Sequence, residues 1–178
     1  VVATRLAALI GWAAILNGDR IGAFLFGCDE HQEVAPMGGR NGILKLIHSL
    51  VRWSTQEYSD HQETTYAWSE ALQRLRRVIR PGSLIFLLSD FYEIDNESER
   101  HLTRLRQHND MVACQIADVL ELRPPPPGRY GVTDGRTTRI LDTRSSRSRQ
   151  QYQNYFAHHH QKVRDLMRKR TIPLITLA

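Results

Sequence analysis

Two short apolar runs constrain the fold of this chain more than any other feature of its sequence. Residues 83–88 (SLIFLL) and 111–117 (MVACQIA) are too short to be separate helices, and they contain almost no polar residues. Unbroken apolar strands are typical of parallel sheets, because helices cover both faces of such sheets. We therefore predict that 83–88 is a central strand and 111–117 another interior strand of an α/β domain.

Helix and strand patterns also alternate upstream of these runs. Residues 3–16 are strong helix formers with apolar residues on more than one face, which predicts a helix that is buried on two sides and stops at Asn17-Gly18. Residues 20–28 (RIGAFLFGC) predict an interior strand. The segment 29–40 contains a proline and two glycines, so it is either a loop or a short edge strand.

Apolar residues at helical spacing predict most of the remaining elements. Four consecutive prolines at 124–127 form a stiff connector, and residues 131–142 predict a hairpin that turns at Asp134-Gly135. The order describes one domain over residues 1–178, with 122–149 as a loop and hairpin insertion. The other predicted elements are a helix over 43–51 capped by Asn41, a helix over 68–79 before Pro81-Gly82, helices over 97–108 and 150–170, and a last strand over 172–177.

The composition excludes several classes of protein. The 178 residues include two cysteines, Cys28 and Cys114, and neither lies in a disulfide or zinc-binding pattern, so we expect buried, reduced thiols in a cytoplasmic protein. The longest apolar stretch, residues 6–16, is far shorter than the roughly 20 residues that a membrane-spanning helix needs. The sequence shows neither a signal peptide nor a glycine-rich phosphate-binding loop.

Acidic residues follow the two apolar runs directly. Ser89 and Asp90 end the first predicted strand, and Asp118 ends the second, with Glu121 three residues later. In open α/β sheets, ligands bind outside the carboxyl ends of the strands, so we predict a binding site at Asp90. Asp118 and Glu121 either line the same crevice and contact a partner, or Asp118 stabilises a turn by accepting backbone N–H bonds.

Three segments resemble a known family: AALIGWAAILNGDRIGAFLFG at 7–27, ALQRLRRVIRPGSLIFLLSDF at 71–91 and HNDMVACQIADVLE at 108–121. They are similar to the bacterial von Willebrand factor A-like family catalogued as domain of unknown function 58. The resemblance implies a three-layer, Rossmann-like von Willebrand A-type domain with a mostly parallel sheet. It also implies a non-enzymatic protein-interaction module, since the family has no established reaction and is usually met beside MoxR-type AAA+ ATPases.

The resemblance further implies a metal-ion-dependent adhesion site. In this fold an Asp-x-Ser-x-Ser, a threonine and a later aspartate supply oxygen ligands of the kind that Mg²⁺ prefers. Asp90, preceded by Ser89, matches the later aspartate, and Thr64 or Thr65 lies near the position of the threonine. The Asp-x-Ser-x-Ser is not in this sequence, which implies that residue 1 lies downstream of the family's first strand. We expect Mg²⁺ in the full-length protein and no metal at Asp90 in residues 1–178.

Other features support alternative functions. The net charge of +5 comes mainly from residues 144–149 and 162–170, so a nucleic-acid-associated protein is the first alternative. A metal-dependent hydrolase, in which Asp90 and Asp118 share the ion, is the second. The histidines at 158–160 are adjacent on a helix and cannot converge on one ion, so we expect them to be structural or exposed. A sheet edge left unpaired by an absent first strand predicts a homodimer as a further option.

Overall fold

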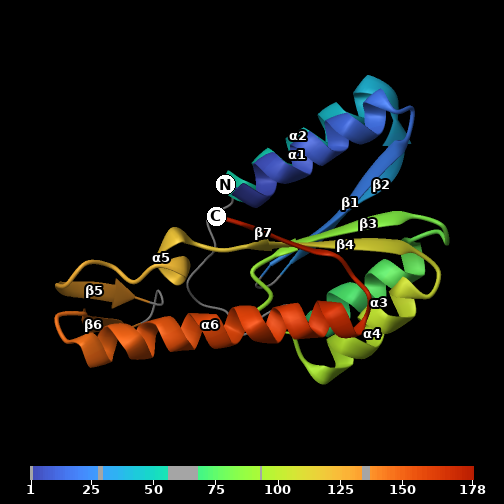
Figure 1. Ribbon diagram of the computed structural model, residues 1–178. Coiled ribbons are helices and arrows are strands. Elements are labelled where there is room, and N and C mark those ends of the chain that lie inside the picture. Colours follow the sequence, from blue (N-terminus) through green and yellow to red (C-terminus); the bar gives the residue numbers. More distant parts are fainter. Residues whose placement is uncertain (1, 28–29, 56–67, 93, 134–136) are drawn as a thin grey trace.

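The structure is a computed structural model that describes residues 2–27, 30–55, 68–92, 94–133 and 137–178. Helices and strands alternate along most of the chain (Figure 1). The helices are α1 (Val2–Leu16), α2 (Gly39–Thr55), α3 (Trp68–Val78), α4 (Asn96–Arg106), α5 (Val119–Leu122) and α6 (Ser146–Lys169). The strands are β1 (Arg20–Phe26), β2 (His31–Gly38), β3 (Leu84–Ser89), β4 (Asp110–Ile116), β5 (Arg129–Thr133), β6 (Thr138–Asp142) and β7 (Leu174–Leu177).

Three strands form a parallel sheet in the order β3-β4-β7. Leu84 is level with Asp110 and Ser89 with Gln115, so β3 and β4 end at the same edge of the sheet. The strand β7 pairs with the second half of β4. The predicted α/β class with a parallel sheet is confirmed. The prediction that 83–88 is a central strand is wrong for the described residues, because β4 lies in the middle and β3 has a hydrogen-bonded neighbour on one side alone.

A separate antiparallel pair is formed by β1 and β2, with an irregularity in register between Ile21 and Ala23. The prediction that β1 is an interior strand is wrong for the described part of the chain, where β1 bonds to β2 alone and its residues are partly exposed. Its apolar run resembles that of a buried strand, but local sequence does not determine how many neighbours a strand has. For 29–40, the structure selects the edge strand, β2, over the loop.

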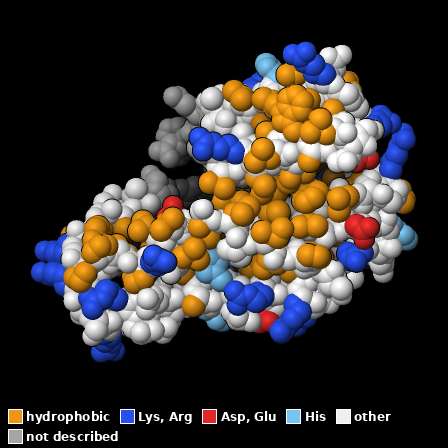
Figure 2. Space-filling model, turned by 45° about the horizontal axis from the view of Figure 1, so that its top comes forward, with side chains coloured by type: hydrophobic (Ala, Val, Ile, Leu, Met, Phe, Trp, Pro, Cys, Tyr) orange, Lys and Arg blue, Asp and Glu red, His pale blue; other side chains and the backbone are white. Residues whose placement is uncertain are grey.

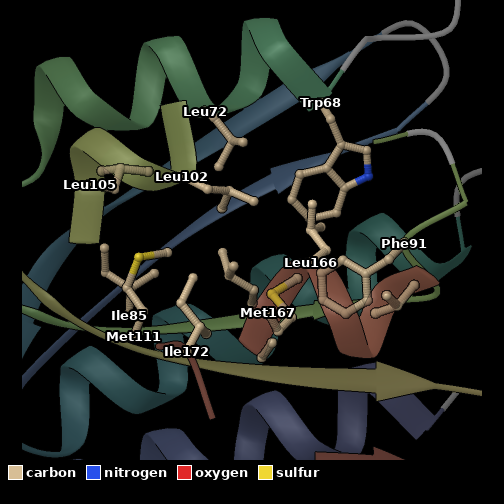
Figure 3. Packing of buried hydrophobic residues seen from close by; sticks show 13 residues of the cluster. Trp68, Leu72, Ile85, Phe91, Leu102, Leu105, Met111, Leu166, Met167 and Ile172 are labelled. Carbon is tan, nitrogen blue, oxygen red and sulfur yellow. The ribbon is translucent and has the colours of Figure 1, made fainter. Parts of the chain in front are cut away.

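Helices lie on both sides of the strands (Figure 1). Alternate residues of β3 point to opposite faces: Ile85 and Leu87 are buried, whereas Leu84 and Phe86 are 58% and 37% exposed. Apolar side chains accordingly gather over the middle of the face that Figure 2 shows. The main core lies between the sheet and α3, α4 and α6, and Figure 3 shows its packing around Trp68, Leu72, Ile85, Phe91, Leu102, Leu105, Met111, Leu166, Met167 and Ile172.

The first two helices differ in part from their predictions. The end of α1 is as predicted, at Leu16 just before Gly18, which has a positive φ of 80°. The helix is not buried on two sides, however, because Leu9 and Leu16 are 67% and 81% exposed. Asn41 does not cap α2 but lies inside it, since this helix begins at Gly39. Gly39 has a positive φ of 66°, and it allows β2 to turn directly into the helix.

The predicted hairpin is formed by β5 and β6, although its predicted turn at Asp134-Gly135 lies outside the described residues. The hairpin and the first half of α6 project from the rest of the molecule (Figure 1). Cys114 is a free, buried thiol, as predicted, whereas Cys28 lies outside the described residues. None of the described helices is long and apolar enough to cross a membrane.

Candidate functional site

The carboxyl end of β3 carries a tight turn built from Ser89, Asp90 and Phe91. Ser89 Oγ accepts a hydrogen bond from Phe91 N (3.1 Å) and donates one to Asp90 Oδ1 (3.3 Å). Asp90 Oδ1 also accepts a hydrogen bond from Tyr92 N (3.3 Å). These bonds hold the Asp90 side chain exposed at the edge of the sheet, at the position predicted from the sequence.

Phe91 anchors this turn in the core. Its backbone has a positive φ of 63°, which costs a residue other than glycine about 1–3 kcal/mol. Its ring is 2% exposed and stacks on Trp68, with ring centroids 5.5 Å apart and an angle of 25° between the planes. Because burial of the ring offsets the backbone strain, the position of Asp90 is fixed by packing rather than by a loose loop.

The helix α6 reaches the same turn through His159. The Nε2 atom of His159 donates a hydrogen bond to the Asp90 carbonyl oxygen (2.9 Å). The imidazole also stacks on the Tyr92 ring, with centroids 3.7 Å apart and planes 7° from parallel. Residues 69 positions apart in the sequence thus meet at the turn, and α6 becomes part of the candidate site.

Glu121 and His160 form the inner side of the site. The Nε2 atom of His160 lies 3.7 Å from Glu121 Oε2, and both side chains are largely buried, at 12% and 17% exposure. Burial lowers the pKa of His160, although the Glu121 charge acts in the opposite direction. The imidazole is therefore neutral at neutral pH, and its contact with Glu121 is not an ion pair. Burial, the charge of Glu121 and a hydrogen bond to Glu121 raise the pKa of Tyr92.

Gln115 lies near the carboxyl end of β4, and Asp118 lies just after this strand. Asp118 Oδ1 accepts a hydrogen bond from Leu120 N (2.8 Å) and caps α5, so Asp118 has the turn-stabilising role that the sequence left open. Gln115 is level with Ser89 and 2% exposed, and its Nε2 atom has no hydrogen-bond partner among the described residues. A buried donor of this kind is usually satisfied by an ordered water.

The described residues do not by themselves match a Mg²⁺ site at Asp90. No group of three or more His, Cys, Asp or Glu side chains in the described ranges is placed to hold a metal ion. The Ser89 hydroxyl already takes part in two hydrogen bonds of the turn. Thr64 and Thr65 lie outside the described residues. The expectation that residues 1–178 bind no metal at Asp90 stays a prediction, which a calorimetric Mg²⁺ titration tests.

The profile of the family described as Protein of unknown function DUF58 matches residues 1–162. The chain belongs to this family. No curated protein matches the chain.

Two solved structures are similar to this DUF58 chain. The conserved hypothetical protein BatB from Bacteroides thetaiotaomicron has 12% sequence identity and a TM-score of 0.54, over 98% of this chain and 79% of that chain. An aerotolerance-related membrane protein from Bacteroides fragilis, with multiple mutations to serines, has 11% identity and a TM-score of 0.51, over 99% and 79%. At these identities the similarity shows the fold alone.

Sequence reasoning left Tyr92 out of the candidate site and expected the histidines at 158–160 to be structural or exposed. His158 is exposed, whereas His159 and His160 make the structural contacts described above. The position of Tyr92, directly after Ser89-Asp90-Phe91, was a usable signal. For His160 the signal lay in its spacing, because the apolar residues Val163 and Met167 follow it three and seven positions later on one face of the predicted helix. His159 gave no signal of this kind, since its contacts depend on where α6 packs.

Proposed function

We propose that this chain is a cytoplasmic, non-enzymatic module that binds a protein partner at the edge of the parallel sheet around Asp90. The observation that carries the proposal is the Ser89-Asp90-Phe91 turn. It presents the exposed Asp90 carboxylate next to the strained backbone of Phe91, and it is fixed by the buried Phe91 ring and by His159. Strained backbone that the surrounding structure holds in place is concentrated at functional sites.

The chemistry of the turn supports binding over catalysis. A serine nucleophile needs a base that accepts its proton. Here the Ser89 hydroxyl donates to Asp90 in the turn, and His159 is directed at the Asp90 carbonyl. Among the described residues, no histidine is hydrogen-bonded to Ser89. The arrangement therefore favours a rigid docking position over an activated hydroxyl.

We propose a MoxR-type AAA+ ATPase as the partner, on the strength of the sequence resemblance. The test is co-purification of the tagged chain with the MoxR-type ATPase of the same organism, for the wild type, Asp90→Ala and a control. Asp110→Ala is a matched control, because Asp110 is also exposed and lies at the opposite end of the neighbouring strand.

Asp90→Ala is expected to lower the recovered ATPase by roughly tenfold or more, the effect of losing a charge-assisted contact at an interface. Asp110→Ala is expected to recover as much ATPase as the wild type. Equal recovery with all three proteins would reject the proposal.

A further inference from the structure

We infer that the partner presents an arginine side chain to this site, whose guanidinium stacks on Tyr92 and is bound by the Asp90 carboxylate. This inference rests on the proposed function and specifies the chemistry of the partner. The site has two parts, an aromatic surface and a carboxylate, which belong to the neighbouring residues Tyr92 and Asp90.

The Tyr92 ring is the aromatic surface. His159 stacks on one face of the ring in a nearly parallel arrangement, yet the residue is still 37% exposed. More than a third of Tyr92 thus stays open to solvent although His159 stacks on its ring. Tyr155 lies close enough to contribute to the raised pKa of Tyr92, and it is 65% exposed. His159 thus holds the Tyr92 ring in place from α6, and the exposed part of Tyr92 is the surface on which we infer that a planar ligand stacks.

The Asp90 carboxylate is the charged part. Its Oδ1 atom is occupied by the hydrogen bonds from Ser89 and Tyr92 N, and no hydrogen bond from a described residue reaches Oδ2. The carboxylate lies close enough to the Tyr92 side chain for its charge to contribute to the raised pKa of the phenol. The hydrogen bond from Tyr92 N also places the carboxylate next to the backbone of the residue that carries the ring.

These two parts together favour arginine over the other charged side chains. A guanidinium is planar, stacks on aromatic faces and donates parallel N–H bonds to a carboxylate, whereas a lysine ammonium is a more strongly hydrated point charge. An acidic side chain would be repelled by Asp90 unless a metal ion lay between them. Arginine and tyrosine are also the residues that most often dominate binding energy at protein interfaces.

The experiment is an NMR titration of residues 1–178 with blocked tripeptides. The probes are Gly-Arg-Gly, Gly-Lys-Gly and Gly-Glu-Gly, each acetylated and amidated, and the last is added with and without MgCl₂. We expect Gly-Arg-Gly to shift the backbone N–H signals of Phe91 and Tyr92 in a saturable way, several-fold more tightly than Gly-Lys-Gly.

Variants assign the two parts of the site. Asp90→Asn keeps an oxygen for the turn and removes the charge, and it is expected to weaken the arginine peptide by roughly tenfold. Tyr92→Leu is expected to remove the preference for arginine over lysine, whereas Tyr92→Phe retains the stacking surface and the preference. Asp110→Asn, at the far end of the sheet, is expected to change neither the affinity for the arginine peptide nor the preference for arginine over lysine.

Equal binding of the arginine and lysine peptides, or unchanged binding to Asp90→Asn, would overturn the inference. Binding of Gly-Glu-Gly that requires Mg²⁺ would overturn it too, in favour of a metal-bridged acidic partner. If the ATPase is lost with Asp90→Ala but the arginine peptide does not bind, the inference fails and the proposed docking at Asp90 stands.

Discussion

Three adjacent residues at the end of β3 have different physical tasks. Ser89 closes the turn, Asp90 carries the exposed charge, and Phe91 anchors the turn in the core. The position of Asp90 could be predicted from sequence, because an acidic residue directly after an apolar strand lies at the edge of a parallel sheet. The left-handed backbone of Phe91 could not, since nothing local distinguishes it from an ordinary core phenylalanine.

Substitution of Phe91 separates packing from backbone strain. Phe91→Ala is expected to lose about 3–5 kcal/mol of unfolding free energy, because it leaves a cavity beside Trp68. Phe91→Gly loses the same ring but relieves the positive φ, so it is expected to be more stable than Phe91→Ala by about 1 kcal/mol. Urea unfolding followed by circular dichroism measures both. A glycine variant less stable than the alanine variant would show that the backbone is not strained in solution.

Glu121 can be tested through the ionisation of Tyr92. Glu121→Gln removes a charge and weakens a hydrogen bond that both raise the Tyr92 pKa, so this pKa is expected to fall towards its usual value. It should remain elevated, because burial is the largest cause. The measurement is an NMR titration of tyrosine ring carbons, with Tyr92→Phe to assign the signal and Asp110→Asn as the control. No change in Glu121→Gln would mean that Glu121 does not contact Tyr92.

At the scale of elements, the sequence predicted most of the helices and strands, but it did not predict which side chains meet between them. The contact between α4 and α3 is an example. His101 on α4 is 5% exposed and lies in the interface with α3, where Arg76 Nη1 is 3.0 Å from its Nδ1 atom. Burial and the Arg76 charge lower the pKa of His101 more than Glu97 raises it. A neutral, buried histidine is thus part of the contact between the two helices.

This histidine predicts a pH dependence of stability. Because its pKa is lowered on folding, the unfolded chain binds more protons below the ordinary histidine pKa of about 6.5, and stability falls as the pH decreases from there. His101→Gln retains an acceptor for Arg76 and does not titrate. The difference in urea-unfolding free energy between pH 7.5 and pH 5.5, two test values about one unit either side of that pKa, should therefore be smaller than in the wild type. His108→Gln, at an exposed position, should leave the difference unchanged.

At the scale of the whole molecule, the sequence could not predict how many hydrogen-bonded neighbours each strand has. The runs of β1 and β3 both resemble buried strands, yet each has one hydrogen-bonded neighbour among the described residues. A strand's apolar pattern reports how its faces are covered but not whether its edges are paired. Unpaired strand edges with apolar side chains promote association between chains.

The exposed side of β3 predicts weak self-association of residues 1–178, which bears on the proposed homodimer. Leu84→Lys places a charge on β3 at a side chain that is 58% exposed, and it is expected to lower the self-associated fraction at high concentration without a large loss of stability. Sedimentation velocity over a concentration series measures this fraction. Ile140→Lys in the β5–β6 hairpin is a control of similar exposure, at 64%. Equal effects of the two variants would mean that β3 is not the surface involved.

Trp68 on α3 contacts both the antiparallel pair β1–β2 and the turn after β3. Its indole lies edge-on to Phe26 at the end of β1, with centroids 5.0 Å apart, and it stacks on Phe91 in the turn. With Trp12 and Trp53 changed to phenylalanine, the remaining indole would be an intrinsic optical reporter. Its emission wavelength and quenching would respond when either the antiparallel pair or the Asp90 turn separates from α3, so partner-induced rearrangements could be followed without an attached dye.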